Sequence, residues 1–142
     1  MIERTLARTT ECIDPSQQPK NLEAGAVSEL VGIVRFTFHA GQLEQFKRLA
    51  AQSMEIVRTQ DTGTLQFTVY FNDDQSECIV LERYRDSAAL IEHAAHIGDA
   101  LTEAILATGS VSGELLGEPS AELSAKLAGS EVPRLFTPFL SL

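Results

Sequence analysis

Residues 64–84 read TLQFTVYFNDDQSECIVLERY, and this stretch decides the fold. Thr64–Phe71 alternates apolar and polar side chains, as a half-buried strand does. The polar residues NDDQ follow, and Ser76–Tyr84 is again rich in β-branched and aromatic residues. Two strand-like runs separated by a short polar turn predict a β-hairpin in the middle of the chain.

An amphipathic segment flanks the hairpin on each side. From Gln42 to about Gln60, apolar residues recur at steps of three and four, which predicts a helix with Gly63 near its C-terminal cap. After the hairpin, residues 85–105 predict a second helix, capped by Asp86 or Ser87 and able to bend at Gly98. The inward stripe of this second helix would be Leu90, Ala94, Ile97, Leu101, Ala104 and Ile105.

Two further strands are expected at Glu29–Phe38 and Ser110–Gly117. The order strand, helix, strand, strand, helix, strand is typical of a ferredoxin-like α+β fold, an antiparallel sheet with both helices on one face. A short helix capped by Ser120 should follow. We expect an N-terminal extension over residues 1–28, a domain over 29–130 and an apolar tail over 131–142. The tail contains two prolines, so it should lie against the molecule rather than in the centre of the sheet.

The first strand is apolar on both faces, because Val31 and Ile33 alternate with Val34 and Phe36. The third strand has the same property. Helices cover one face only, so a bare apolar face of several hundred Å² would remain, which is more than a monomer normally exposes. We therefore expect a homodimer that packs sheet against sheet about a two-fold axis, with the tail as an arm that crosses to the partner.

Composition narrows the classes of protein that are compatible with the chain. Its 142 residues suit one domain, and its formal net charge is −9 with scattered Lys and Arg, which argues against nucleic acid or an anionic membrane as the main partner. No apolar run reaches the length of a membrane span, and the first twenty residues do not read as a secretory signal. The two cysteines, Cys12 and Cys78, form no framework, so the expected location is the cytoplasm.

Four short motifs occur in an order that resembles the antibiotic biosynthesis monooxygenase family. They are HAGQLEQFKRLA (39–50), TQDTGTLQF (59–67), RDSAALIEHAAHIGDAL (85–101) and GELLGEPSAELSAKLAG (113–129). The resemblance covers roughly residues 30–130. It implies a dimeric α/β barrel, and a family that includes cofactor-free monooxygenases of quinols and aromatic polyketides, heme-degrading enzymes and members without known activity.

The resemblance also implies a ligand pocket between the sheet and the helices. By analogy its lining would come from Phe36, Phe38, Phe67, Tyr84, Leu90, His93 and Ile97. Polyketide-oxidising members carry Asn and Trp four residues apart on the third strand and a Tyr six residues further. The matching positions here are Val80, Tyr84 and Leu90. Heme-degrading members need an Asn on the first strand, which this chain lacks, so neither mechanism transfers residue by residue.

His93 and Tyr84 are the candidate catalytic residues. Oxidation by O₂ without a cofactor needs an electron-rich substrate anion, and an imidazole at the helical position of His93 could remove the proton. Tyr84 could orient a substrate hydroxyl. The alternatives stay open: His93 could be a half-buried histidine that hydrogen-bonds a neighbour across the dimer, and Tyr84 could simply cover the end of the sheet.

The remaining polar candidates are expected to have structural roles. His96 lies three residues after His93, but a metal site needs a third ligand, His39 lies at a strand end and no carboxylate obviously converges, so we expect no metal. Glu82 shares a strand face with Tyr84, and a salt bridge to Arg35 or Arg83 is favoured over a role as base. Cys78 is expected to be a small buried hydrophobe.

Two functions are therefore compatible with the sequence. The first is a homodimeric, cofactor-independent monooxygenase that oxidises a small aromatic or quinol-like compound with O₂. The second is a protein of the same fold that binds a hydrophobic small molecule without catalysis, or serves as a structural dimer. A His93→Ala variant separates them, because only the first predicts a large loss of rate.

Overall fold

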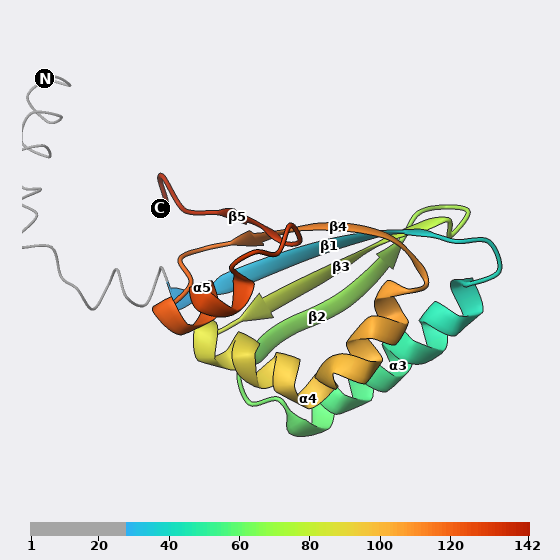
Figure 1. The fold of residues 1–142 in the computed structure, drawn as a ribbon, viewed down its shortest axis with the longest axis horizontal. Helices are drawn as coiled ribbons and strands as arrows, with labels where there is room; N and C mark the ends of the chain where they lie inside the picture. Colours follow the sequence, from blue (N-terminus) through green and yellow to red (C-terminus); the bar gives the residue numbers. More distant parts are fainter. Residues whose placement is uncertain (1–27) are drawn as a thin grey trace, which may run out of the picture.

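The computed structural model describes residues 28–142, so all but the last residue of the expected N-terminal extension lies outside the described residues. Five strands form one sheet in the order β2-β3-β1-β4-β5 (Figure 1). The first four pair antiparallel, and β5 adds parallel to β4 at the edge. Their bounds are β1 Leu30–Phe38, β2 Thr64–Phe71, β3 Glu77–Tyr84, β4 Gly109–Leu116 and β5 Arg134–Phe136.

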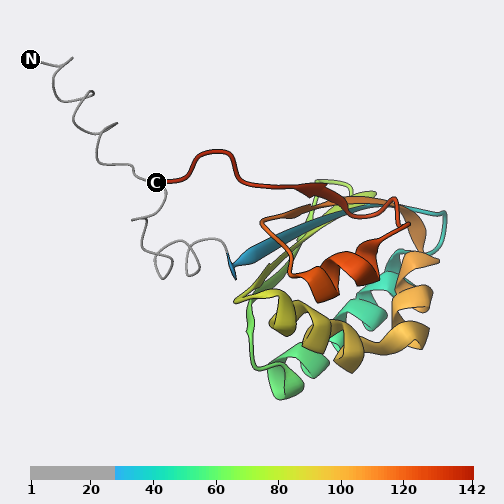
Figure 2. The same ribbon diagram turned by 60° about the vertical axis from the view of Figure 1, so that its left-hand side comes forward.

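Three helices cover one face of this sheet, as both ribbon views show (Figures 1 and 2). They are α3 Leu43–Gln60, α4 Ser87–Leu106 and α5 Ala121–Leu127. The arrangement confirms the predicted ferredoxin-like α+β fold. Within the part of the chain that the structure describes, no helix combines the length and the apolar character that a membrane crossing requires.

The core lies between the sheet and the helices and has two clusters of buried side chains. One is built on the first half of β1 and comprises Leu30, Tyr84, Ala89, Leu115 and Leu123. The other, built on the second half of β1, comprises Phe36, Phe46, Cys78 and Val80. Burial raises the pKa of the Cys78 thiol to about 11, so Cys78 acts as the small hydrophobe that the sequence predicts.

Helix α4 has the cap and the bend that its sequence predicts. The Asp86 side chain accepts a hydrogen bond from the Ala89 backbone N–H at 2.8 Å, which satisfies one of the free donors of the first turn. Gly98 interrupts the helix with φ 79° and ψ 161°. That combination is essentially restricted to glycine, so the bend depends on this residue.

Two local expectations change. Gly63 does not cap α3, because the helix ends at Asp61 with extended backbone. A side chain at Gly63 would instead clash with Ala89, so the glycine lets the α3–β2 loop pack against α4. The tail forms an unpredicted strand at the sheet edge, where Leu135 pairs with Leu115. Beyond it the chain runs away from the body, and Phe139 is 92% exposed (Figure 2).

Candidate active site

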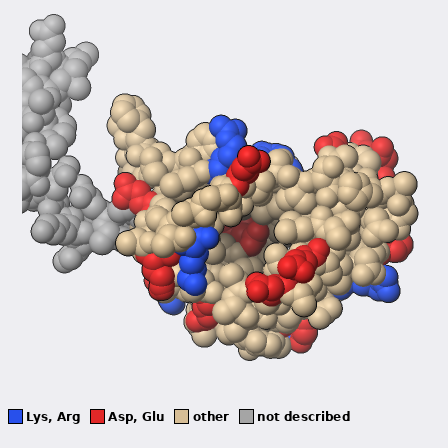
Figure 3. Space-filling model, viewed as in Figure 1, with Lys and Arg blue, Asp and Glu red and all other residues tan. Residues whose placement is uncertain are grey.

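A pocket of about 430 Å³ lies between the inner face of the sheet and α4. This volume is within the range of small-molecule sites, roughly 300–1,000 Å³. Side chains of β1, β2 and β3 form its floor, and both halves of the bent α4 form its wall. Thr102 and Leu106 from the end of α4, and Val132 and Pro133 from the tail, also line it. In the space-filling view the middle of this face is hollowed, with acidic atoms inside the hollow (Figure 3).

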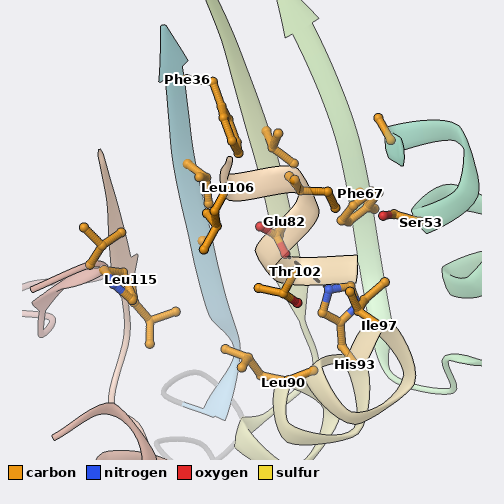
Figure 4. A pocket seen from close by; sticks show the side chains of 18 of the residues that line it. Phe36, Ser53, Phe67, Glu82, Leu90, His93, Ile97, Thr102, Leu106 and Leu115 are labelled. Atoms are coloured by element: carbon orange, nitrogen blue, oxygen red, sulfur yellow. Dashed lines mark ion pairs between the residues drawn. The ribbon is translucent and has the colours of Figure 1, made fainter. Parts of the chain in front are cut away.

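The structure brings six of the seven candidate site residues into the lining of this pocket. They are Phe36, Phe67, Tyr84, Leu90, His93 and Ile97. Figure 4 shows five of them around the cavity, with Leu90, His93 and Ile97 coming from α4. Phe38 lies elsewhere: its ring packs 4.8 Å from the ring of Phe46 and 6.1 Å from that of Phe71. With Phe36, these rings make an aromatic cluster of Phe36, Phe38, Phe46 and Phe71.

His93 is held in one orientation by three neighbours. Its Nδ1 lies 2.8 Å from Asp61 Oδ2, and the Asp61 side chain is only 2% exposed. Its ring packs between the rings of Tyr84 and Phe67, with centroid distances of 5.2 and 5.6 Å. With Nδ1 donating to the carboxylate, Nε2 is the nitrogen free to accept a proton. Nε2 lies 3.6 Å from Glu82 Oε1.

Asp61 reaches the two histidines because α3 ends at this residue. The backbone turns into an extended conformation there, and the side chain points to α4. Histidines three residues apart lie on one helix face, so one carboxylate can serve both. Asp61 Oδ1 lies 2.7 Å from Nδ1 of His96, while the Thr64 hydroxyl donates to Oδ2 at 2.7 Å.

These contacts keep Asp61 ionised. Burial alone would raise the pKa of the Asp61 carboxyl, but hydrogen bonds from His96, Thr64 and His93 outweigh it, and the pKa is lowered. A carboxylate in this position fixes the tautomer of His93 and stabilises the imidazolium that forms when Nε2 takes a proton. The partner of His93 is thus a residue of its own chain, and the expectation of a partner across a dimer is not needed.

Glu82 faces the pocket and makes neither of the salt bridges expected from the sequence. Arg35 pairs with Glu114 and Arg83 pairs with Glu29. The alternation of a strand explains the error, because Arg35 and Arg83 project from the outer face of the sheet while Glu82 projects from the inner one. The contacts of Glu82 are Nε2 of His93 and the hydroxyl of Tyr84, which donates to Oε1.

The surroundings of Glu82 oppose its ionisation. Burial raises the pKa of the Glu82 carboxyl despite the lowering effects of the Tyr84 hydrogen bond and of His93. Burial and the neighbouring Glu82 also raise the pKa of the Tyr84 hydroxyl, which therefore stays a donor. Glu82, Tyr84 and His93 line the largely apolar pocket, and Asp61, outside the lining, holds His93. These four residues form a polar cluster, and the pKa values of its two carboxyls are shifted in opposite directions.

A second group of polar side chains shares Asp61 with this cluster and links α4 to the segment that follows α3. Ligand atoms of Asp61, Glu92 and His96 all lie within 4.8 Å of one another, so a carboxylate does converge on His96. Glu92 already accepts hydrogen bonds from the backbone N–H and the hydroxyl of Thr62, at 2.7 and 2.9 Å. Existing hydrogen bonds therefore account for this arrangement without an ion.

The polar cluster can perform proton transfer beside a largely apolar lining. His93 Nε2 is an acceptor backed by the Asp61 carboxylate, and Glu82 is a second titratable group whose Oε1 lies 3.6 Å from that nitrogen. Pairs of groups whose pKa values are pushed apart mark acid and base roles. The apolar lining keeps water from a reactive intermediate.

Asp61 and the inward position of Glu82 are what sequence reasoning missed. The sequence does contain a signal for Asp61. An acidic residue stands directly after the first predicted helix, and the strand that follows leads to the same edge of the sheet as the histidine pair. The signal for Glu82 was the strand alternation itself, which excludes the two arginines. Val132 and Pro133 had no signal, because only the three-dimensional path of the tail brings them to the pocket.

Several solved structures share the fold. MupZ from Pseudomonas fluorescens matches with a TM-score of 0.69 and 24% identity, covering 81% of this chain and 93% of that chain. Rv0793 from Mycobacterium tuberculosis has a TM-score of 0.56 and 22% identity, covering 66% and 97%. SnoaB from Streptomyces nogalater, a cofactor-independent oxygenase, has a TM-score of 0.53 and 15% identity, covering 66% and 96%.

The sequence itself gives a second, independent comparison. A search of curated proteins found no significant match. A family model described as antibiotic biosynthesis monooxygenase matches residues 30–105, more than half of the chain. These residues run from the first strand to the end of α4 and contain all four members of the polar cluster. The chain therefore belongs to the antibiotic biosynthesis monooxygenase family.

Proposed function

We propose that this protein is a cofactor-independent monooxygenase that oxidises a small phenolic or quinol-like compound with O₂. The observation that carries the proposal is the Asp61–His93 pair, whose free Nε2 opens into an apolar pocket of about 430 Å³. A base in a dry site generates the electron-rich anion that can give an electron to O₂ directly. The oxygenase SnoaB, which has the same fold, supports this reaction class.

The oxidation is balanced for an anthrone, a substrate in which a CH₂ group lies between aromatic rings that carry phenolic hydroxyls. His93 Nε2 takes a proton from the substrate, and the resulting anion transfers an electron to O₂. The two radicals combine into a C–O bond, and the peroxide oxygen takes the proton back from His93. Loss of water from the CH–OOH group leaves a carbonyl. The sum is CH₂ + O₂ → C=O + H₂O, with O₂ as the oxidant.

The test is O₂ uptake with dithranol, a dihydroxyanthrone, as the first probe and a panel of hydroquinones beside it. A His93→Gln variant should lose about 10²–10⁴-fold in turnover, the usual contribution of a general base. His39→Gln is the matched control, because His39 is an exposed histidine at the far end of β1. Equal rates for His93→Gln and the wild type would contradict the proposal.

The alternative is a binding protein without catalysis. Val80 and Leu90 stand where related oxygenases carry Asn and Tyr, which favours this alternative. Tight binding of dithranol, measured by quenching of tyrosine fluorescence, without any O₂ uptake across the panel would establish it.

We further propose that the protein acts as a homodimer packed through the outer face of the sheet. Ile33 pairs with Leu81 across β1 and β3 on that face, and Ile79, 39% exposed, lies on the same face. An exposed strip of this kind is unusual for a monomer. Native mass spectrometry should give the mass of two chains, and Ile79→Lys should shift the population to monomer. A wild-type monomer would contradict it.

A further inference from the structure

Glu82 occupies a position that a simple oxygenation base does not need. It lies on β3 at the floor of the pocket, paired with Gly32 on β1 and with Phe67 on β2. Glu82, Tyr84 and His93 are the ionisable side chains among the lining residues, and none of the lining residues is a Lys or Arg. A carboxyl group buried beside apolar neighbours without a cation is costly as an anion.

The two oxygens of Glu82 have different surroundings. Oε1 accepts the Tyr84 hydroxyl and lies 3.6 Å from His93 Nε2, too far for a hydrogen bond. Oε2 lies on the side of Gly32, where a side chain would come within 3.9 Å of it. Figure 4 shows one oxygen directed at His93 and the other directed away from it. Oε2 is therefore the atom that can carry a proton into the pocket.

His93 thus lies between two carboxyls with opposite tendencies. Asp61 accepts three hydrogen bonds and stays ionised, whereas Glu82 accepts one hydrogen bond, from Tyr84, and has no Lys or Arg beside it in the pocket lining. The groups that face Glu82 are Tyr84 from its own strand and His93 from α4, while β1 and β2 present Gly32 and Phe67. Neither Gly32 nor Phe67 can neutralise an anion.

We propose that Glu82 is the general acid of this site, holding a proton on Oε2 in the empty pocket and delivering it to an oxygen of the bound molecule while His93 acts as base. The inference rests on the proposed oxygenase function and extends it to the peroxide step. The pocket would accept neutral molecules with two oxygen functions, a phenol or enol and a carbonyl, and reject carboxylates and phosphates, because it contains no cation to bind them.

The peroxide step balances with this pair. In the CH–OOH intermediate, Glu82 gives its proton to the distal oxygen as the O–O bond breaks, and that oxygen leaves as water. His93 Nε2 takes the C–H proton, and the C–H electron pair becomes the second bond of the carbonyl. The distance of 3.6 Å between Nε2 and Oε1 is too long for a direct transfer, so the imidazolium returns its proton through the water that this step releases, which gives a proton to Oε2 and restores the starting state.

The turnover test uses dithranol with the wild type, Glu82→Gln and Glu77→Gln. Glu77 is an exposed acid on the same strand, so Glu77→Gln is the matched control. We expect Glu82→Gln to keep O₂ uptake within a few-fold but to form the quinone about 10²-fold more slowly. Organic hydroperoxide, detected by a ferrous xylenol orange assay after catalase treatment, should accumulate instead. Quinone formation at the wild-type rate by Glu82→Gln would overturn the proposal.

A second measurement does not depend on turnover. Infrared difference spectra of wild type minus Glu82→Gln at neutral pH should show the C=O stretch of a protonated carboxyl group, and Glu77→Gln should show only carboxylate bands. Carboxylate bands for Glu82 at neutral pH would overturn the general-acid proposal even if the oxygenase function holds. If no panel compound is oxidised but the protonated band is present, the oxygenase function fails while the protonated state of Glu82 stands.

Discussion

The aromatic cluster is built on β1, β2 and α3, and the polar cluster on β3, α4 and the residue after α3, and the two clusters are organised by different forces. Phe36, Phe38, Phe46 and Phe71 pack with ring centroids 4.8–6.3 Å apart. In the polar cluster, hydrogen bonds join Asp61 to His93 and Tyr84 to Glu82. Nε2 of His93 lies 3.6 Å from Oε1 of Glu82. The first arrangement releases free energy on folding, and the second keeps charge and proton acceptors away from water at a cost. We expect substitutions in the aromatic cluster to change stability at every pH, and substitutions of the two carboxyls of the polar cluster to change it in a way that depends on pH.

The largest effect on stability should come from Phe46→Ala. Phe46 is 2% exposed and contacts three other rings of the aromatic cluster, so its loss leaves a cavity. The free energy of unfolding should fall by about 3–5 kcal/mol, measured by urea denaturation. Phe139→Ala, at a 92% exposed position, should change it by less than about 0.5 kcal/mol. A small loss of unfolding free energy for Phe46→Ala would mean that the aromatic cluster contributes no more to stability than the polar cluster.

Asp61→Asn should have the next largest effect and should depend on pH. Hydrogen bonds to a buried charge are worth about 1.5–3 kcal/mol, so the variant should lose that amount near neutral pH. The pKa of Asp61 is lowered in the folded state. Its contribution is therefore present above the ordinary carboxyl pKa and is lost as pH falls through the lower folded value. Denaturation at several pH values checks this, with Asp73→Asn in the exposed turn as control.

Glu82→Gln should show the opposite pH dependence. The pKa of Glu82 is raised in the folded state, so its protonated form is fully compatible with folding below the ordinary carboxyl pKa. Wild-type stability should fall relative to the variant as pH rises through the folded pKa. Thermal unfolding at about pH 4 and about pH 9 tests the sign, because glutamine does not titrate. A wild type that gains on the variant at high pH would contradict the assignment.

His96→Ala should have the smallest effect. His96 has 28% of its side chain exposed, and Asp61 keeps its hydrogen bonds from His93 and Thr64 without it. We expect a loss of less than about 1 kcal/mol and turnover within a few-fold of the wild type. Comparison of His96→Ala with His93→Gln under the same conditions therefore separates the histidine that faces the pocket from the one that does not. Equal losses would mean that both histidines act together.

The fold could be predicted because each element carries its own periodic signal. Thr64–Phe71 has the predicted bounds, and the helix predicted from Gln42 starts one residue later. Errors occurred where tertiary contact overrides local pattern. Gly63 reads as a helix cap but is needed for contact with Ala89, and β5 has no periodicity of its own because it is three residues long at a sheet edge.

The candidate site could be predicted only in part, because tertiary contacts decide the positions of some of its residues. The family resemblance pointed to His93 and Tyr84, although His93 lies outside the apolar stripe of its predicted helix. Asp61 comes from a loop, and its role depends on where α3 ends relative to α4, which no local pattern states. The ion pairs predicted for Glu82 are wrong because Arg35 and Arg83 project from the opposite face of the sheet, where they pair with Glu114 and Glu29.

Residues Val132 and Pro133 line the pocket, yet they lie outside residues 30–105, the part of the chain that the family model matches. The proton-transfer groups and one side of the cavity are thus encoded in separate segments of the gene. A change in the last quarter of the chain can alter the shape available to a ligand without touching Asp61, Glu82 or His93. Exchange of the terminal segment of this chain is therefore a direct route to a new ligand shape that leaves the proton-transfer groups unchanged.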